Sequence, residues 1–449
     1  MSDTVSRKVH KALRVRLYPS EEQKTILDKT FGCCRVVYNE RLTEHIDYYS
    51  TYKDNPDRPK FKGTLPKELR EKKYPWLGEG TIAEALVSSQ KHCEQAYSNF
   101  FKSCKGQRKG KKVGYPKFKS KKSHKDSFTL CMIRQEDLID FNSRTVFIPK
   151  LKNTKFRIAN SSLKSKWIEW FLEATPLNMT ISRNACGEYY CSVLFEREQD
   201  LDQNIRLSNS IGLDFSPNNL YIDSNNNPAP NYKPYKQLNK KKLTKLQRRL
   251  SRKQKGSKNR EKARVKLARF EKHIADSRKD YIEKETLRLV RSYNVIGIED
   301  LNLQGMMKFP HNAKNYVDTS WYTFTQKLIW KSQFNNCIVI KSDRFYPSSK
   351  TCNHCGYVNS ELTLKDRKWI CPNCGTEIIR DENAGRNLRD NAINLLTEEI
   401  NSVLGMERTK VMSMEDMETT YFNGILSGVS YEVENQSSDA LKGSSSVFS

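Results

Sequence analysis

The pattern of apolar and polar positions changes along the first hundred residues from that of a strand to that of helices. Residues 9–18 alternate well enough to predict a strand. Ser20 and Gln23 then stand at the spacing of a capping box, and apolar side chains recur at helical spacing as far as Tyr49. A second amphipathic helix is predicted over residues 81–103, so this part of the chain is expected to form a helical bundle.

Strand patterns dominate further along the chain. Several short strands are predicted between residues 126 and 206, and the most regular, GEYYCSVLFERE at 187–198, alternates after a glycine turn. Two later apolar runs, SIGLDFS at 210–216 and VIGIED at 295–300, are typical of buried strands. Each of these two runs carries an acid at or near its end.

A further helix and strand are predicted before a group of cysteines. Residues 315–336 show helical spacing, and residues 337–345 form an apolar run typical of a buried strand. The alternation of strands and helices predicts an α/β multidomain protein. Four large side chains of the predicted helix are expected in the core: Trp321, Phe324, Leu328 and Trp330.

The chain is strongly basic, with 79 Lys and Arg against 52 Asp and Glu, a net charge of +27 over 449 residues. Self-repulsion of this size does not stabilise a monomer, so we expect a polyanionic partner. No apolar run approaches the length of a membrane span, and the N-terminal stretch has no apolar core for a signal peptide. We therefore expect a cytoplasmic protein with no membrane partner.

Two segments carry much of the positive charge. Residues 104–125 contain ten Lys/Arg and no acid, with Tyr115 and Phe118 interleaved. Residues 236–291 contain 22 Lys/Arg and 6 Asp/Glu, an excess of 16 positive charges, and Gly256–Ser257 marks a break between two predicted helices. Both segments would suit contact with nucleic-acid phosphates. A solvated charge run or a cationic coiled coil would explain them without a partner. The residues expected to bind nucleic acid are Lys109, Lys111, Lys112, Lys117, Lys119, Lys121, Lys122, Lys241, Lys245, Arg248, Arg249, Arg252 and Lys253.

Four of the 12 cysteines have the spacing of a zinc site. Two Cys-x2-Cys pairs are separated by 15 residues, and Gly356 and Gly375 follow the pairs, where a knuckle needs left-handed backbone. Four thiolates leave no open position on the ion, so we expect one structural Zn²⁺. Its ligands are expected to be Cys352, Cys355, Cys371 and Cys374.

Seven residues after the last of these cysteines, Asp381 stands at an expected helix start. A structural zinc ribbon with an unrelated surface acid would explain this stretch alone. The order Asp214, Glu299, zinc knuckle and Asp381, however, resembles the TnpB family of transposon-encoded, RNA-guided nucleases, relatives of the compact type V CRISPR effectors. The resemblance covers most of the first 395 residues, and includes GYPKFKSKK at 114–122 and RDENAGRNL at 380–388.

The resemblance implies a catalytic role for the three acids. Asp214, Glu299 and Asp381 correspond to the RuvC-type triad of an RNase H-like domain. In that role they would hold two Mg²⁺ ions for phosphodiester hydrolysis. Many relatives have a glycine-containing turn after the first acid, whereas DFSPNNLYIDS here keeps the carboxylate in a different turn. Asp300 is expected on the opposite strand face from Glu299, and Asp223 is the weaker candidate ligand.

The resemblance also implies the partners and the division of the chain. A guide RNA and a target DNA are expected in a prokaryotic cytoplasm, at the nucleoid, and the protein could be a monomer or a homodimer. A wedge β-barrel with inserted recognition helices would precede the nuclease domain. The expected parts are 1–19, first barrel strand; 20–125, helical recognition region with basic loop; 126–206, remainder of the barrel; 207–345, RuvC-like nuclease domain with the basic helix pair 236–291; 346–378, zinc ribbon; 379–396, last RuvC element; and 397–449, a largely disordered tail.

Four functions compete for this pattern. The leading one is an RNA-guided DNA endonuclease encoded by an insertion-sequence-type transposon. A compact type V CRISPR effector would use the same chemistry with a guide from a repeat array. A nuclease-inactive RNA-guided repressor is disfavoured because all three acids are present. A DNA transposase is disfavoured by the long basic helix pair and by the zinc knuckle between the second and third acids.

Overall fold

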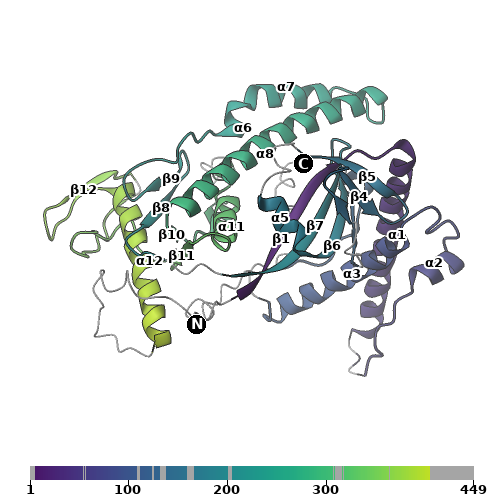
Figure 1. The fold of residues 1–449 in the computed structure, drawn as a ribbon, viewed down its shortest axis with the longest axis horizontal. Helices are drawn as coiled ribbons and strands as arrows, with labels where there is room; N and C mark the ends of the chain where they lie inside the picture. The colour runs from purple at the N-terminus through teal and green to yellow at the C-terminus, as the bar shows by residue number, and fades with distance from the viewer. Residues whose placement is uncertain are drawn as a thin grey trace. The chain divides into compact units, whose positions relative to one another are not determined.

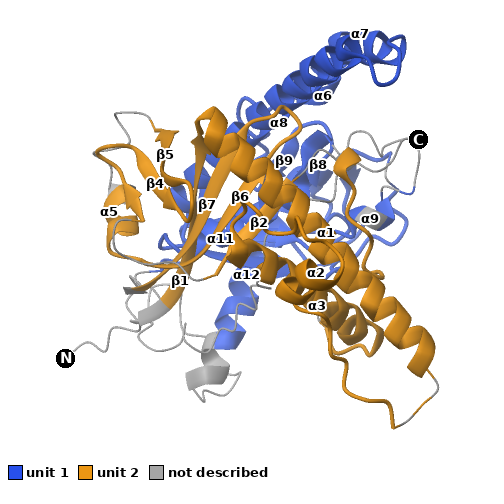
Figure 2. Cartoon of the chain, turned by 90° about the vertical axis from the view of Figure 1, so that its right-hand side faces the viewer, with its two compact units in different colours: residues 1–7, 199–431 blue, residues 8–198, 432–449 orange. Residues whose placement is uncertain are grey.

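The computed structural model describes residues 6–404, apart from residues 54, 56, 109–111, 124–125, 132–137, 159–165, 201–204, 307, 309–315, 317 and 364. The described chain divides into two compact units (Figure 2). The N-terminal unit contains residues 8–198, and the C-terminal unit contains residues 199–404 together with Ser6 and Arg7. No described helix combines the length and the apolar character that crossing a bilayer requires.

The N-terminal unit contains a seven-stranded sheet in the order β2-β6-β7-β1-β5-β4-β3. The strand predicted at the start of the chain lies inside this sheet, between β7 and β5. Chain segments far apart in sequence therefore share one set of backbone hydrogen bonds. The strands are β1 (Ser6–Leu17), β2 (Asp126–Leu130), β3 (Ile139–Asp140), β4 (Thr145–Ile148), β5 (Lys152–Arg157), β6 (Thr175–Arg183) and β7 (Tyr189–Asp200).

Helices α1 (Glu21–Tyr52), α2 (Pro66–Lys72) and α3 (Ala83–Cys104) lie between β1 and β2 in the chain. The predicted capping box is confirmed: the Gln23 backbone N–H donates to Ser20 Oγ at 3.2 Å, and the Ser20 N–H donates to Gln23 Oε1 at 2.9 Å. Helices α1 and α3 pack through a buried cluster formed by Tyr38, Leu42, Cys93 and Tyr97.

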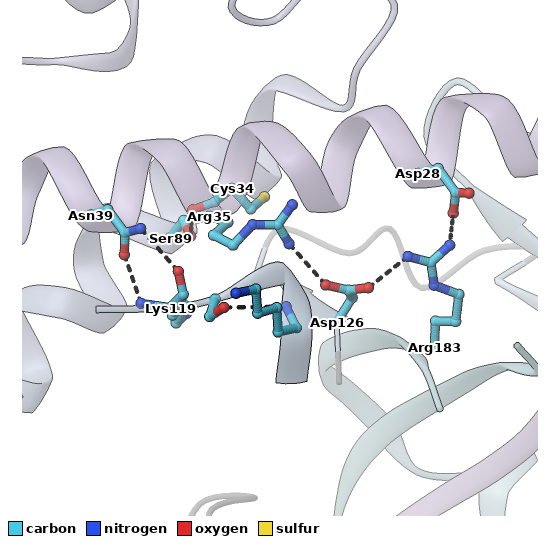
Figure 3. Close-up of polar contacts among 10 residues, drawn as sticks. Asp28, Cys34, Arg35, Asn39, Ser89, Lys119, Asp126 and Arg183 are labelled. Carbon is cyan, nitrogen blue, oxygen red and sulfur yellow. Dashed lines mark hydrogen bonds and ion pairs between the residues drawn. The ribbon is translucent and has the colours of Figure 1, made fainter. Parts of the chain in front are cut away.

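A buried carboxylate joins α1 to the sheet of the N-terminal unit. Asp126 of β2 accepts hydrogen bonds from Arg35 of α1 at 3.0 Å and from Arg183 of β6 at 2.6 Å (Figure 3). Arg183 also donates to Asp28 of α1 at 2.6 Å. Because two guanidinium groups flank it, this buried charge is compensated on both sides.

Two short helices of the N-terminal unit were not predicted, α2 in the stretch between the two predicted helices and α5 further along the chain. Residues between the predicted strands form α5 (Lys166–Leu172), in which Ile168, Trp170 and Phe171 are buried. The segment WIEWFL is a short apolar run, and such runs do not distinguish a buried strand from a buried helix. The unit also contains a single 3-10 turn, Lys121–Ser123.

The C-terminal unit is built on a four-stranded sheet in the order β11-β10-β8-β9. Strand β10 pairs in parallel with both β8 and β11, and β8 and β9 form an antiparallel hairpin. These strands contain mostly buried apolar residues, as expected for parallel strands covered by helices. Their bounds are β8 (Ser210–Ser216), β9 (Leu220–Asp223), β10 (Val295–Glu299) and β11 (Ile338–Ser342).

Helix α11 (Trp321–Ser332) covers this sheet within the predicted range 315–336. Three of the four predicted core residues, Trp321, Phe324 and Leu328, are fully buried. Trp330 is only half-buried, because it lies on the side of the helix where it packs against Phe334 at 4.9 Å between ring centroids. A short helix α9 (Leu303–Met306) precedes α11.

The predicted basic helix pair is α7 (Lys240–Ser251) and α8 (Lys258–Ser292), preceded by the short α6 (Tyr235–Leu238). The break falls at the expected place: Gly256 has φ +86°, and Ser257 caps α8 through a 3.1 Å hydrogen bond from the Arg260 N–H. Buried Asp318 ties the pair to the rest of the unit. It accepts the backbone N–H groups of Lys236 and Gln237 at 3.1 Å and pairs with Arg278.

A two-stranded ribbon, β12 (Lys368–Ile370) and β13 (Glu377–Ile379), leads directly into α12 (Arg380–Leu404). The sequence analysis placed the start of a disordered tail at residue 397, which is wrong for residues 397–404. No Gly or Pro occurs between Arg386 and Leu404, and buried Leu396 still packs on Val295 and Ile338 of the sheet. The rest of the expected tail, 405–449, lies outside the described residues.

Glycines bring α12 unusually close to the sheet, along which it runs in Figure 1. A Cβ atom on Gly212 of β8 would lie 1.9 Å from the carbonyl oxygen of Gly385 in α12. A Cβ atom on Gly297 of β10 would lie 2.2 Å from the carbonyl oxygen of Leu388. Both contacts are with backbone, so no side-chain rotation could relieve them. The position of α12 therefore depends on the absence of side chains at these strand positions.

We predict that Gly297→Ala lowers the free energy of unfolding of the C-terminal unit by about 3 kcal/mol, because the added methyl group pushes α12 from β10. The matched control is Gly32→Ala in α1, where an added Cβ meets nothing within 4 Å. That variant should be neutral or more stable by up to about 1 kcal/mol. Urea denaturation followed by circular dichroism measures both. Equal stability of the two variants would contradict the close-packing argument.

Candidate active site and zinc centre

Two of the predicted acids lie side by side on neighbouring parallel strands. Strands β8 and β10 are in register, with Leu213 paired to Ile298, and Asp214 and Glu299 are the residues that follow this pair. Side chains two residues apart on a strand point to the same face. Asp214 therefore shares the face of Gly212, and Glu299 shares the face of Gly297, which is the face covered by α12.

The third acid comes from α12 itself. Asp381 lies in the first turn of the helix, four residues before Gly385, which contacts β8. Residues four apart lie on the same face of a helix, so Asp381 is on the side that faces the sheet. The helix N-terminus also favours a negative charge at this position. The structure thus brings together Asp214, Glu299 and Asp381, which are far apart in the sequence.

Electrostatics show that these carboxylates act on one another. Asp214 is 8% exposed, and burial together with the charges of Glu299 and Asp381 raises its pKa well above the usual range. Burial also raises the pKa of Glu299. The guanidinium groups of Arg380 and Arg367 act in the opposite direction on Asp214. The three carboxylates therefore carry more negative charge than these two arginines compensate.

Two arginines pair with Asp381. Arg380 donates to its Oδ1 from Nε at 3.0 Å and from Nη2 at 2.8 Å, and Arg367 Nη1 lies 3.1 Å from its Oδ2. Arg380 therefore forms an ion pair with the acid next to it in the chain. Arg367 is held nearby because its backbone carbonyl accepts the Arg380 N–H at 3.0 Å.

Ser348 is a site residue that the sequence analysis missed. Its buried hydroxyl donates to Glu299 Oε1 at 2.9 Å, and this hydrogen bond opposes the rise in the pKa of Glu299. Its carbonyl oxygen accepts Asn387 Nδ2 of α12 at 2.7 Å, and the same amide group contacts the Thr351 carbonyl at 2.7 Å. A serine four residues before a cysteine pair carries no recognisable signal, because only the fold places it beside Glu299.

The other two acids considered from the sequence have separate partners. Asp300 accepts a 2.6 Å hydrogen bond from Arg344. Asp223 accepts the backbone N–H groups of Asn225 and Asn227 at 2.9 and 2.8 Å, which stabilises the turn after β9. Neither carboxylate is needed to explain the electrostatics of Asp214.

The four predicted cysteines form a closed cluster. Their sulfur atoms all lie within 4.8 Å of one another, with 3.7 Å between Cys352 and Cys374 and 3.5 Å between Cys355 and Cys371. Tetrahedral Zn²⁺ with Zn–S bonds of about 2.3 Å places its sulfurs about 3.8 Å apart. The cluster therefore fits a zinc ion. Within the described ranges it is the one group of three or more His, Cys, Asp or Glu side chains gathered this closely.

The two knuckles have the same backbone design. In each, the glycine N–H donates to the first cysteine carbonyl at 2.9 Å, and Gly356 and Gly375 have φ values of +76° and +72°, as predicted. Contact with the Thr376 hydroxyl lowers the pKa of the Cys374 thiol to about 6, whereas burial raises that of Cys352 to about 12. A bound cation would favour the thiolate form of both.

Buried amides attach the first knuckle to α12. Asn383 donates to the Thr351 carbonyl at 2.7 Å and accepts the Asn353 N–H at 2.9 Å. The Asn353 side chain donates to Asn387 at 3.1 Å and to Asp390 at 2.8 Å. The cysteine cluster is thus fixed to the helix that carries Asp381.

The residues predicted to bind nucleic acid lie at the surface where the structure describes them. Lys109 and Lys111 fall outside the described residues. Lys119 is engaged within the chain, because its ammonium group lies 3.9 Å from the centre of the Tyr38 ring. The remaining ones are exposed: Lys112, Lys117, Lys121, Lys122, Lys241, Lys245, Arg248, Arg249, Arg252 and Lys253.

A basic groove between α7 and α8 was not predicted. Its wall includes Lys242, Lys266 and Arg269, and the Lys242 ammonium lies 4.6 Å from the centre of the Phe270 ring. The helical spacing of lysines and arginines indicates that α7 has basic residues on more than one face. The pairing with α8 that makes one of them concave is decided by the tertiary structure.

Family models match three parts of the chain. Residues 192–309 match a family described as "Probable transposase", and residues 321–388 match a "Cas12f1-like, TNB domain". Residues 8–54 match a "Helix-turn-helix domain", although the structure has strand β1 and the single long helix α1 over this range.

Curated relatives match over most of their length. A Streptomyces pristinaespiralis protein named "Putative RNA-guided DNA endonuclease" is 30% identical over 85% of this chain and 89% of its own. The Escherichia coli protein "Putative RNA-guided DNA endonuclease InsQ" is 27% identical over 84% and 91%. A solved structure, "Cryo-EM structure of the Cas12f1-sgRNA-target DNA complex", covers 85% of this chain and 99% of its own, with a TM-score of 0.48 and 13% identity, which is too distant to define the fold. On this match to the Streptomyces protein, which covers most of both chains, the chain belongs to the TnpB family that its sequence resembles.

Proposed function

We propose that this protein is an RNA-guided DNA endonuclease encoded by an insertion-sequence-type transposon, which hydrolyses DNA at sites complementary to its guide. The convergence of Asp214, Glu299 and Asp381 on one partly buried site carries this proposal. The names of the full-length relatives support the same activity. The excess of positive charge supplies the means of holding nucleic acid.

The sheet supports an RNase H-like nuclease domain. The order β9-β8-β10-β11, with an antiparallel hairpin followed by parallel strands, puts the first and second acids on adjacent central strands. A helix packed on the same face supplies the third acid. The seven-stranded sheet of the N-terminal unit, with helices inserted after its first strand, would correspond to the wedge barrel and recognition region.

The three carboxylates fit hard divalent cations better than any softer metal, because the donors are all oxygen. Asp214, Glu299 and Asp381 would hold two Mg²⁺ ions, which when bound would activate the attacking water and stabilise the leaving oxygen. The chain's own residues prepare the site. The buried strands place two acids in register, Ser348 orients Glu299, and Arg367 and Arg380 hold Asp381 at the helix start.

The zinc site would be structural. Its four sulfurs would fill the coordination sphere of one ion, and the ribbon that they close ends directly in α12. A folded ribbon would therefore keep Arg367 and Asp381 in place. Guide RNA and target DNA would contact the exposed lysines and arginines of 104–125 and of α7.

The triad variants should separate cleavage from binding. Asp214→Ala, Glu299→Ala and Asp381→Ala should each lower guided DNA cleavage by about a thousand-fold or more, because each removes a proposed Mg²⁺ ligand. Binding of guide and target should remain close to wild type. Cleavage assays in Mg²⁺ and gel shifts in EDTA measure the two properties.

Asp300→Ala is the matched control, because it removes an acid next to Glu299 that pairs with Arg344. An exposed ion pair of this kind contributes at most about 1 kcal/mol, so most activity should remain. If Asp300→Ala were inactive and Glu299→Ala active, the assignment of the strand face would be wrong. Full cleavage by all three triad variants would exclude the nuclease proposal.

Purified protein should contain about one zinc per chain, and Cys371→Ser should lose both the zinc and most of its cleavage activity, because metal binding contributes to folding of the ribbon. Cys104→Ser, at an exposed free cysteine outside the cluster, should keep both. Elemental analysis together with the cleavage assay checks this. Protein prepared without chelators that contains no zinc would count against the site.

Ser348→Ala should slow cleavage by about ten- to a hundred-fold, because a hydrogen bond to a charged group contributes about 1.5–3 kcal/mol. Its zinc content and guided binding should not change. Ser342→Ala is the control: it removes another buried hydroxyl, which accepts a hydrogen bond from Asn391 of α12. Comparable slowing by both variants would mean that Ser348 acts through general stability and not through Glu299.

A further inference from the structure

The basic segment 104–125 presents two exposed aromatic rings. Phe118 is 57% exposed and Tyr115 is 43% exposed. Lys117, Lys121 and Lys122 beside them are exposed as well. A single exposed aromatic residue is ordinary on a protein surface. An exposed ring in a stretch with ten Lys/Arg and no acid is a specific combination.

This segment is held against the helices. The Asn39 side chain of α1 accepts the Lys119 N–H at 2.8 Å and donates to the Lys119 carbonyl at 3.0 Å, so it closes a two-point clamp on the backbone (Figure 3). The Val113 N–H donates to Ser103 Oγ at 2.9 Å. The Lys119 ammonium lies over the Tyr38 ring of α1. The exposed Phe118 ring is therefore carried by a backbone segment that hydrogen bonds fix against the helices.

The charges around Phe118 favour an anionic partner. The nearest acid on α1 next to the clamp, Glu40, is already paired with Lys73 and hydrogen-bonded to Tyr74, at 2.7 and 2.6 Å. Tyr115 is partly engaged, since its hydroxyl contacts the Tyr97 hydroxyl and its ring packs edge-on against Phe100. Phe118 is thus the ring left open for a ligand. An apolar protein surface would have to cover the neighbouring ammonium groups, whereas a nucleotide offers a ring to stack and a phosphate for the lysines.

We propose that Phe118 is a stacking platform for an unpaired nucleobase, and that Lys117, Lys121 and Lys122 hold the phosphates beside that base. This inference rests on the proposed nucleic-acid-binding function, and it identifies one contact between the protein and its nucleic-acid partner. Stacking needs a rigid ring, and the Asn39 clamp supplies it by fixing the backbone one residue away. The unpaired nucleotide could belong to RNA or to single-stranded DNA.

Fluorescence anisotropy tests the proposal with full-length protein freed of co-purified nucleic acid by high salt. The probes are fluorescein-labelled single-stranded RNA, single-stranded DNA of the same length, and an abasic DNA with the same number of phosphates. Phe118→Ala should weaken binding of a base-bearing probe by about five- to a hundred-fold, and leave the abasic probe unchanged. The probe that loses affinity identifies whether RNA, DNA or both supply the base.

Three further variants keep the test decisive. Phe118→Trp should retain affinity, and its fluorescence should be quenched by the base-bearing probe. Phe147→Ala, at a comparably exposed phenylalanine on β4, should bind every probe like wild type. Lys121→Ala should instead weaken binding of all probes, the abasic one included, and should reduce the salt dependence.

Unchanged binding of all base-bearing probes by Phe118→Ala would overturn the proposal, as would an equal loss with the abasic probe. Guided cleavage by the wild type separates this failure from failure of the proposed function. If the wild type cleaves with its guide while Phe118→Ala binds normally, only the stacking contact is wrong. If the wild type neither binds nor cleaves nucleic acid, the proposed function itself is wrong.

Discussion

The close approach of α12 to the sheet is the constraint on which the candidate active site depends. Gly212 and Gly297 leave no side chain between the strands and the helix backbone. Gly385 likewise has no side chain that would push α12 away from the sheet. With ordinary side chains at these positions the helix would stand farther away. The helix N-terminus, and Asp381 with it, would then move away from Asp214 and Glu299. The three acids interact because three glycines are present.

The cysteine ribbon adds a second restraint on the same helix. Strand β13 continues into α12 without a loop, and buried asparagines tie the first knuckle to the helix. Ser348 lies at the end of this network and reaches Glu299. Loss of the ribbon would therefore disturb two of the three carboxylates.

Charge is divided between a small buried anionic site and large basic surfaces. Burial raises the pKa of both Asp214 and Glu299, and the charges of Glu299 and Asp381 raise that of Asp214 further, so a cation would stabilise the site. The lysines and arginines outside it form exposed faces on α7 and on the segment after α3. A polyanion held on such faces would be the natural partner of a site that works on phosphodiesters.

Local features whose signals lie within a few residues could be predicted from the sequence. The Ser20 capping box, the helix break at Gly256, the cysteine knuckles with their glycines, and the strands that carry Asp214 and Glu299 at or near their ends all follow from short-range spacing and backbone sterics. Asp381 was placed at a helix start for the same reason. A short apolar run such as α5 was missed because it has no period long enough to identify.

Which of these elements contact one another could not be predicted from local spacing. The contact of Ser348 with Glu299, the Asn39 clamp on Lys119, and the engagement of Lys119 with Tyr38 join residues separated by many positions in the chain. A lysine in a basic run has the same sequence signal whether it faces solvent or an aromatic ring. Side-chain contacts between distant segments depend on how whole helices and strands pack together. The local periodicity of the sequence does not encode that packing.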